Sequence, residues 1–270
     1  MSISQRIFYI NTINKKSGTN QSFTYEIQIP QADGFDKVVL LNASIPNTFY
    51  LVQEEFNTFT LREGEQDITI TIPVGNYSAK VFAVVVASLL SAASPNGWTY
   101  SLELPNQVLA ASTGKFSYTV TGNTSQPSIV CTDKVNINEQ LGFSINPVNT
   151  FENNILDSAT TVNFGAESTL FIHSDIADNG DSDVLQEVYA GNTQNLSYIT
   201  YQCTAPELYS KNLQTNRSNN FHFSLTNEKK QLLNLHGVDM QLTLCLYKKD
   251  DTNTLIRNYI KYKVHSESQS

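Results

Sequence analysis

Histidine and acidic side chains are the groups of this chain that could do chemistry, and their spacing decides which chemistry is open to them. The four histidines stand far apart, at His173, His222, His236 and His265. No two of them have the spacing of a metal-binding pair, and structural zinc would need paired cysteines or histidines. We therefore interpret His173, near the end of one predicted strand, and His222, near the start of another, as ordinary strand residues.

An acidic stretch at residues 175–183, DIADNGDSD, places several carboxylates close together. Its composition resembles that of a calcium-binding loop, with Asp178, Asp181 and Asp183 as the candidate ligands. The stretch lacks the ligand spacing and the closing glutamate of an EF-hand loop. An acidic turn is the simpler interpretation, and weak calcium binding is the open alternative.

Motifs for catalysis and nucleotide binding do not occur in the sequence. The serines show no nucleophile-elbow pattern, and the scattered glycines form neither a P-loop nor a GxGxxG run. A glycosidase needs two carboxylates facing each other across a cleft, which a sequence alone does not show. We expect no enzyme activity, no catalytic residue, no metal centre and no cofactor.

Charge and hydropathy narrow the classes of partner. The formal net charge is −8, so the surface as a whole repels phosphate backbones, and we expect no direct binding of nucleic acid. The longest apolar segment, residues 81–93, is shorter than the roughly 20 residues that a bilayer-spanning helix needs, so no membrane insertion is expected. The three cysteines are too few and too widely spaced for a disulfide framework, which fits synthesis in a reducing cytoplasm.

The charges are unevenly distributed along the chain. Acidic residues gather at positions 54–67 and 175–187, whereas basic residues gather in the last quarter. Solvated loops and edge strands protected by charge explain this pattern in the simplest way. The sharper alternative is a pair of complementary patches where identical copies meet side by side.

The elements that must position these residues are mainly strands. Alternating apolar and polar residues predict strands at 6–13 and 23–29 and a hairpin of 58–62 with 68–72. A nearly continuous apolar run predicts a central strand at 36–46, which Pro46 ends. Shorter strand patterns follow at residues 98–104, 116–121, 128–131, 160–164, 169–173, 184–189, 196–203, 220–226, 238–247 and 256–264.

One segment departs from the strand pattern. Asn76 or Ser78 can cap a helix at its N-terminus, and the SPNG sequence at 94–97 ends it. The helix, at about residues 76–93, is apolar nearly all round, which predicts burial against a sheet or at one end of a sandwich. A further single helical turn is predicted at residues 138–143.

Many short strands in one chain of 270 residues predict a mainly β fold, an antiparallel β-sandwich. A single jelly roll with one buried helix is the natural candidate. We predict one domain over residues 1–264, beginning with a strand or arm, and a frayed C-terminal tail at 265–270. A small insertion within roughly residues 100–200 is the open alternative.

Several sequence stretches together resemble a known family. They are VVLLNASIPNTFYLV at 38–52, FTLREG at 59–64, ITIPVGNYSA at 70–79, GKFSYTV at 114–120, EQLGF at 139–143, SLTNE at 224–228 and LHGVDMQLTLCLY at 235–247. In this order they resemble the minor capsid, or penton, proteins of virophages, polinton-like viruses and large eukaryotic DNA viruses. The resemblance covers residues 35–247, most of the chain.

That resemblance implies a single jelly roll at the five-fold vertices of an icosahedral virion. Five copies would form each vertex as a homopentamer and contact the major capsid protein around them. A jelly-roll binding module for a glycan or a host receptor is the alternative, with residues 175–183 as its candidate site. A cupin-type or glycosidase-type enzyme comes third.

Overall fold

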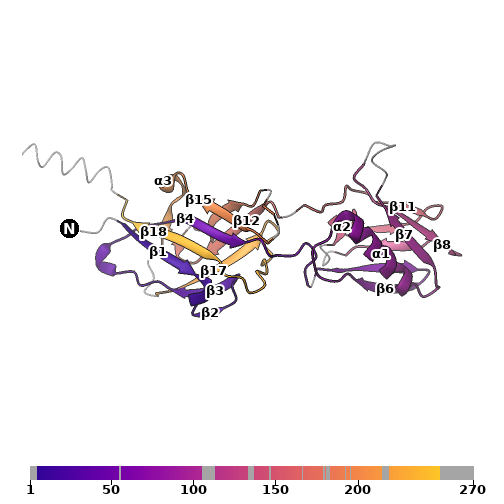
Figure 1. The fold of residues 1–270 in the computed structure, drawn as a ribbon, viewed down its shortest axis with the longest axis horizontal. Coiled ribbons are helices and arrows are strands. Elements are labelled where there is room, and N and C mark those ends of the chain that lie inside the picture. The colour runs from indigo at the N-terminus through magenta and orange to yellow at the C-terminus, as the bar shows by residue number, and fades with distance from the viewer. Residues whose placement is uncertain are drawn as a thin grey trace, which may run out of the picture. The chain divides into compact units, whose positions relative to one another are not determined.

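The computed structural model describes residues 5–249, except residues 55, 105–112, 133–136, 146, 166, 179, 181–182, 192, 195 and 215–218. The fold is mainly β, as predicted, and all its paired strands are antiparallel (Figure 1). Contacts divide the chain into two compact units. Unit 1 comprises Met1–Phe49 and Glu167–Ser270, and unit 2 comprises Tyr50–Ala166.

Unit 1 contains two sheets. Sheet A has the order β1-β18-β4-β16-β13, and β15 also pairs with β4. Its strands are β1 Gln5–Asn11, β4 Lys37–Pro46, β13 Ala177–Asp178, β15 Tyr198–Gln202, β16 Lys211–Leu213 and β18 Gln241–Tyr247. Sheet B has the order β14-β12-β17-β3-β2. Its strands are β2 Ser17–Gly18, β3 Ser22–Glu26, β12 Thr169–Ser174, β14 Val184–Tyr189 and β17 Asn220–Asn227.

The strand order of unit 1 is that of a jelly roll. In chain order its eight main strands are β1, β3, β4, β12, β14, β15, β17 and β18. Counted from one to eight, they lie in the order 1-8-3-6 in sheet A and 5-4-7-2 in sheet B. This arrangement of two interlocked Greek keys defines the jelly roll, so the predicted fold class is confirmed.

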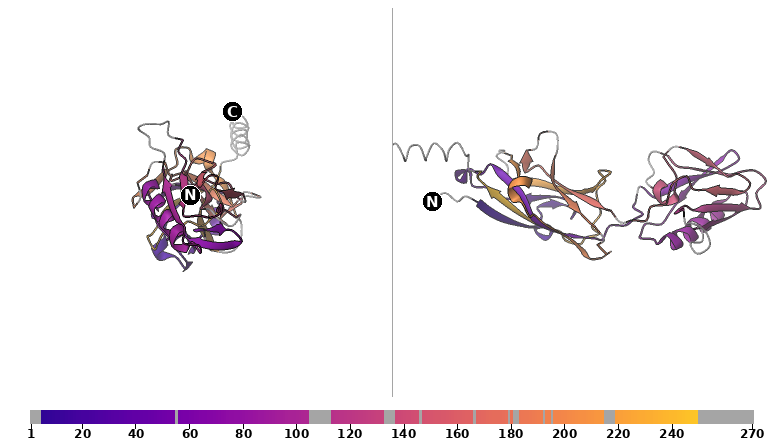
Figure 2. Two further views of the ribbon diagram at one scale, coloured as in Figure 1. Left: turned by 90° about the vertical axis from the view of Figure 1, so that its right-hand side faces the viewer. Right: turned by 90° about the horizontal axis from the view of Figure 1, so that it is seen from above.

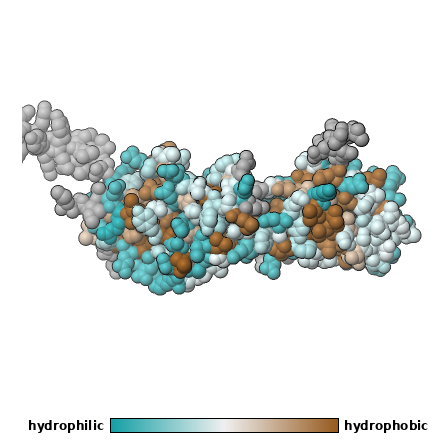
Figure 3. All heavy atoms as spheres, in the orientation of Figure 1, coloured by the Kyte–Doolittle hydropathy of each residue, from teal (hydrophilic) through white to brown (hydrophobic). Residues whose placement is uncertain are grey.

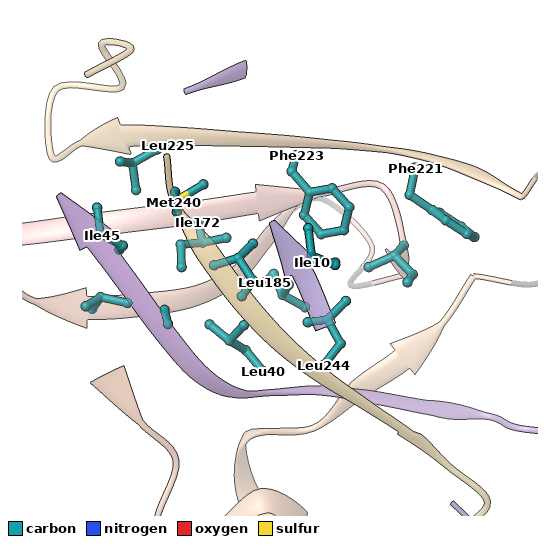
Figure 4. Close-up of a cluster of buried hydrophobic side chains, with 14 of the residues drawn as sticks. Ile10, Leu40, Ile45, Ile172, Leu185, Phe221, Phe223, Leu225, Met240 and Leu244 are labelled. Atoms are coloured by element: carbon teal, nitrogen blue, oxygen red, sulfur yellow. The ribbon is translucent and has the colours of Figure 1, made fainter. Parts of the chain in front are cut away.

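Apolar side chains from both sheets fill the space between them. Figure 4 shows Leu40 and Leu244 of sheet A pointing toward Ile172, Phe223 and Leu225 of sheet B. The pattern follows from strand alternation, since every second residue of β12 and β17 points to the same side. Phe23 and Phe223 stack with ring centroids 5.5 Å apart, joining β3 to β17 within the core.

Unit 2 has its own two sheets (Figure 2) and a hydrophobic core of its own. The first sheet has the order β10-β9-β5-β6, and the second has the order β11-β8-β7. Their strands are β5 Thr58–Glu63, β6 Gln66–Thr71, β7 Thr99–Glu103, β8 Ser117–Thr121, β9 Ser128–Val130, β10 Val148–Thr150 and β11 Ile155–Asp157. The short helices are α2 Asn138–Leu141 in unit 2 and α3 Pro206–Tyr209 in unit 1.

The predicted helix is present as α1, Ala79–Ala93, and packs against β6 and β7. Ser78 is its N-cap, and the Ser78 hydroxyl accepts a hydrogen bond from the Val81 amide at 3.3 Å. Phe82, Val86 and Leu90 are buried. The expected packing of the helix against a sheet is therefore confirmed, and the opposite face of α1 is exposed to solvent.

The division into units differs from the single domain that the sequence predicted over residues 1–264. Unit 2 enters the chain between β4 and β12, and it is larger and begins earlier than the insertion considered at 100–200. Three details of the strand prediction also change. Residues 148–157 contain β10 and β11, residues 204–213 contain α3 and β16, and residues 160–164 form no strand. The predicted strand at 256–264 and the tail at 265–270 lie outside the described residues.

Candidate functional site

His173 is the centre of a hydrogen-bonded chain on sheet B. Its Nδ1 lies 2.8 Å from an Asp183 carboxylate oxygen, and its Nε2 lies 2.8 Å from the Thr226 hydroxyl. The contact with His173, above all its hydrogen bond, lowers the pKa of Asp183 below its ordinary value. The chain joins β12, β17 and the residue before β14.

The order carboxylate, imidazole, hydroxyl is the order found in hydrolase triads. Thr226 is buried within the long strand β17, with 7% of its surface exposed, which leaves little room for a substrate at its hydroxyl. Hydrogen bonds of this kind stabilise neighbouring strands. We therefore assign the three residues a structural role, which agrees with the interpretation of His173 as an ordinary strand residue.

His222 also lies in a strand, as predicted, within β17. Its Nε2 lies 3.2 Å from the Ser22 hydroxyl, and its backbone amide donates to Asp175 at 2.7 Å. Asp175 thus joins the acidic stretch to the start of β17. His222 and His173 have different partners and do not form a common site.

The candidate calcium ligands separate in the structure. Asp178 lies in β13, where its carboxylate accepts a hydrogen bond from the Gly180 amide at 3.3 Å, whereas Asp183 bonds to His173. Asp181 lies outside the described residues. Within the described ranges, no three His, Cys, Asp or Glu side chains come together as a group that could hold a metal ion. Calcium binding by the stretch stays a prediction.

Unit 2 contains a buried carboxylate that the sequence interpretation missed. Glu63 is 1% exposed, and its two oxygens accept hydrogen bonds from the Tyr100 hydroxyl at 2.7 Å and the Asn96 amide at 3.0 Å. Burial, together with the bond to Glu63, raises the pKa of the Tyr100 phenol. The burial of Glu63 could have been predicted from the sequence, because alternation in β5 places Glu63 on the same face as Phe59 and Leu61.

Strand β1 forms an edge of sheet A and carries apolar side chains on its solvent-facing side. In the described part of the chain its one partner strand is β18. Ile7 and Tyr9 point away from the core and are 43% and 77% exposed, and Ile13 just beyond the strand is 68% exposed. An edge strand with exposed apolar residues is a surface that favours contact with another chain. The alternation in this strand was visible in the sequence, but its position at an edge was not.

A second apolar surface lies on α1 of unit 2. Val81 and Val84 are exposed, and together with Ser88 and Ala92 they form the solvent-facing side of the helix. Figure 3 shows hydrophobic residues gathered in this part of unit 2. The sequence predicted the apolar character of the helix but not that one face of it would be exposed to solvent.

No protein-family model and no curated protein matches the chain. Among solved structures, the chain is similar to the crystal structure of the selenomethionine-labelled mavirus penton protein, with a TM-score of 0.44 and 12% identity. The match covers 90% of this chain and all of the other. In the described part of the chain, no helix has the length and apolar character needed to cross a membrane.

Proposed function

We propose that this protein is a structural subunit of a viral capsid, a minor capsid or penton protein. Five copies form a ring at each icosahedral five-fold vertex of the virion and contact the surrounding major capsid protein. The proposal follows the sequence resemblance described above. The observation that carries it is a jelly roll whose edge strand β1 exposes Ile7 and Tyr9.

The jelly roll suits this role because it is stiff and presents defined edges. Strands far apart in sequence close the sandwich, as Gln5 of β1 pairs with Tyr247 of β18. A rigid body loses little conformational entropy on assembly, which favours association. The first step of assembly therefore needs complementary surfaces and not a conformational change.

A ring requires that two different surfaces of each copy meet. Contacts of this heterologous type close into a ring when the rotation between copies allows it. In our proposal, the β1 edge of one copy meets a different surface of the next copy. If β1 met β1 of a second copy instead, the contact would be isologous and would give a dimer.

The oligomeric state of the recombinant chain tests the proposal. We expect sedimentation velocity to show monomers and pentamers, with the pentamer decreasing as NaCl rises from about 0.05 to about 0.5 M, because screening weakens the attraction between oppositely charged surfaces that accompanies the apolar β1 contact. The double variant Ile7→Lys, Tyr9→Lys should lose the pentamer. Its circular dichroism should stay unchanged, because both side chains point into solvent.

Val84→Lys is the matched control, because it places a lysine at an exposed valine of the other unit. This variant should keep the pentamer. A stable dimer of the unmodified chain would contradict the vertex assignment. A pentamer that survives the β1 substitutions would show that the ring uses another surface.

A further inference from the structure

The outer face of sheet A contains a hollow lined by uncharged polar side chains. Its volume is about 320 Å³, near the lower end of the range of about 300–1,000 Å³ that is typical of ligand pockets. The hollow is open to solvent, and we call it the polar hollow. Its lining residues are Asn42, Ala43, Ser44, Thr200, Tyr201, Gln202, Gln241 and Thr243.

Strand register arranges six of these residues as a grid across three strands. Ser44 of β4 pairs with Thr200 of β15 on one side and with Gln241 of β18 on the other. Asn42, two residues earlier in β4, pairs in the same way with Gln202 and Thr243. Because residues two apart share a face, both rows of three side chains point out of the sheet together.

The shape of the polar hollow follows from the residues in this grid. Ser44 is the middle residue of one row and Asn42 of the other, while the Ala43 side chain between them points into the core, so only its backbone lies under the hollow. Longer amides, Gln202 and Gln241, stand on the two flanking strands. A register shift between Thr243 and Leu244 lies directly beside the grid. Irregularities of this kind increase the local twist of a sheet, which deepens a concave face.

The six side chains of the grid are free to bind a ligand. None of them makes a side-chain hydrogen bond to another residue in the described part of the chain. Amides and hydroxyls each offer donors and acceptors. The polar hollow therefore concentrates unpaired donors and acceptors on one rigid surface, where they are solvated until a ligand replaces the water.

We propose that the polar hollow binds a neutral carbohydrate. Sugar hydroxyls both donate and accept, so they match a surface of mixed amides and hydroxyls. No charged side chain lines the hollow, and the chain carries a net charge of −8, so nothing there attracts a phosphate, sulfate or carboxylate. The grid itself is polar throughout, and the exposed apolar residue nearest to it, Tyr9 of β1, pairs with Thr243 at its margin and not within the hollow.

An exposed tyrosine extends the site. Tyr198 stands two residues before Thr200 in β15 and therefore points out of the same face. It is 53% exposed, with a ring that combines an apolar face and a polar hydroxyl. The apolar face of a sugar ring can pack against this ring while its hydroxyls bond to the grid.

This inference goes beyond the capsid role and does not depend on it. The site needs no residue from a second copy, and it adjoins the proposed assembly surface, because Tyr9 of β1 pairs with Thr243 of the grid. A subunit that failed to form pentamers would still carry the polar hollow. Failure of the pentamer test and failure of the carbohydrate test are therefore distinct results.

Saturation-transfer NMR on the full chain tests the proposal, because the method detects weak binding. The probes are maltotriose, mannotriose and the N-acetylglucosamine trimer, with a sulfated heparin disaccharide as the charged comparator. We expect at least one neutral probe to receive saturation. Its Kd should be about 1 mM, because a small open site buries little of the ligand. The heparin disaccharide should receive none.

Substitutions locate the binding. Asn42→Ala and Gln202→Ala should each raise the Kd about fivefold, which is the effect of one lost hydrogen bond. Thr200→Leu should abolish the signal, because it places an apolar side chain without a ring or a hydrogen-bonding group in the polar hollow and removes no buried group. Gln28→Ala is the matched control, because Gln28 is an exposed glutamine of the same unit that lies outside the hollow, and its affinity should be unchanged.

Three results would overturn the proposal. The first is that no neutral probe receives saturation from the unmodified chain. The second is that the grid variants bind as tightly as Gln28→Ala does. The third is that the sulfated disaccharide binds more tightly than the neutral probes. Circular dichroism of each variant identifies a loss of signal that comes from unfolding, and Thr200→Leu supplies an independent variant if an alanine variant fails to fold.

Discussion

Unit 1 and unit 2 are both built from strands, yet they are held together in different ways. Unit 1 closes through strands from opposite ends of the chain, since β1 pairs with β18. Unit 2 is one continuous segment, Tyr50–Ala166, whose strands pair over shorter separations. Short-range pairing lowers the entropy cost of closing each loop, which favours independent folding of unit 2.

Their cores differ as well. The core of unit 1 is mostly aliphatic, with leucine and isoleucine from both sheets (Figure 4). The core of unit 2 is rich in aromatic rings, and Phe82 of α1 lies against Phe116 and Phe164 with centroids 6.3 and 5.1 Å apart. Unit 2 also buries the Glu63 carboxylate. The comparison teaches that the chain combines two independently cored bodies, and that the surfaces for assembly and sugar binding proposed above both belong to unit 1.

Core truncations should separate the two bodies most clearly. Phe82→Ala in unit 2 and Phe223→Ala in unit 1 each remove a fully buried ring, which costs about 3–5 kcal/mol of unfolding free energy. Trp98 is the single tryptophan and is buried in unit 2, so its fluorescence reports the unfolding of that unit. In urea, Phe82→Ala should shift the fluorescence transition to lower concentration.

Phe223→Ala is the matched variant for unit 1. Far-ultraviolet circular dichroism reports the strands of both units. In this variant, the part of that signal that comes from unit 1 should be lost at a lower urea concentration, while the Trp98 transition stays in place. If either substitution moved both transitions by the same amount, the two units would unfold as one cooperative body and the comparison would fail.

Replacing the buried Glu63 should lower the stability of unit 2 by less than the core truncations do, and it should leave unit 1 unaffected. Glu63→Ala leaves the Tyr100 hydroxyl and the Asn96 amide without their acceptor, which costs about 2–4 kcal/mol of unfolding free energy. The Trp98 transition in urea measures the loss. Tyr100→Phe removes one of the two donors and should cost less, about 1–2 kcal/mol.

Glu65→Ala is the control, because Glu65 is an exposed glutamate in the turn two residues further on. It should leave the Trp98 transition where it is. Equal stability of the Glu63→Ala and Glu65→Ala variants would show that the buried hydrogen bonds contribute nothing net.

Local patterns in the sequence predicted the elements well. Alternation predicted β1, β3 and the β5–β6 hairpin, and the Ser78 cap with the apolar run predicted α1. Many short strands predicted the sandwich. These features depend on neighbouring residues, so a sequence carries them directly.

Features that depend on distant contacts could not be predicted in the same way. The polar hollow needs β4, β15 and β18 side by side, and nothing in any one of these strands indicates the other two. The unit boundaries at Phe49 and Glu167 have no glycine-rich or proline-rich linker to mark them. Thr226 and Asp183 meet His173 only because β12, β17 and the start of β14 are neighbours in sheet B.

The smallest expected effect belongs to the His173 chain of unit 1 and depends on pH. The pKa of Asp183 is lowered, chiefly by the hydrogen bond with His173, so the ionised carboxylate favours the folded state. This contribution is present above the ordinary carboxyl pKa of about 3.9 and is lost as the pH falls through the lowered value. Asp183 is largely exposed, so solvent screening limits the contribution to at most about 1 kcal/mol.

Asp183→Asn should therefore be slightly less stable than the unmodified chain near pH 6 and equally stable near pH 2, where both side chains are neutral. Urea unfolding of unit 1, followed by circular dichroism between pH 6 and pH 2, should show the stabilities of the two proteins converging as the pH falls. The Trp98 transition should be the same for both proteins at every pH, because Asp183 belongs to the other unit. A difference between the two proteins that persists unchanged to pH 2 would mean that Asp183 acts through packing and not through its charge. A matching change in the Trp98 transition would mean that the two units are coupled, because a charge on one unit would then alter the stability of the other.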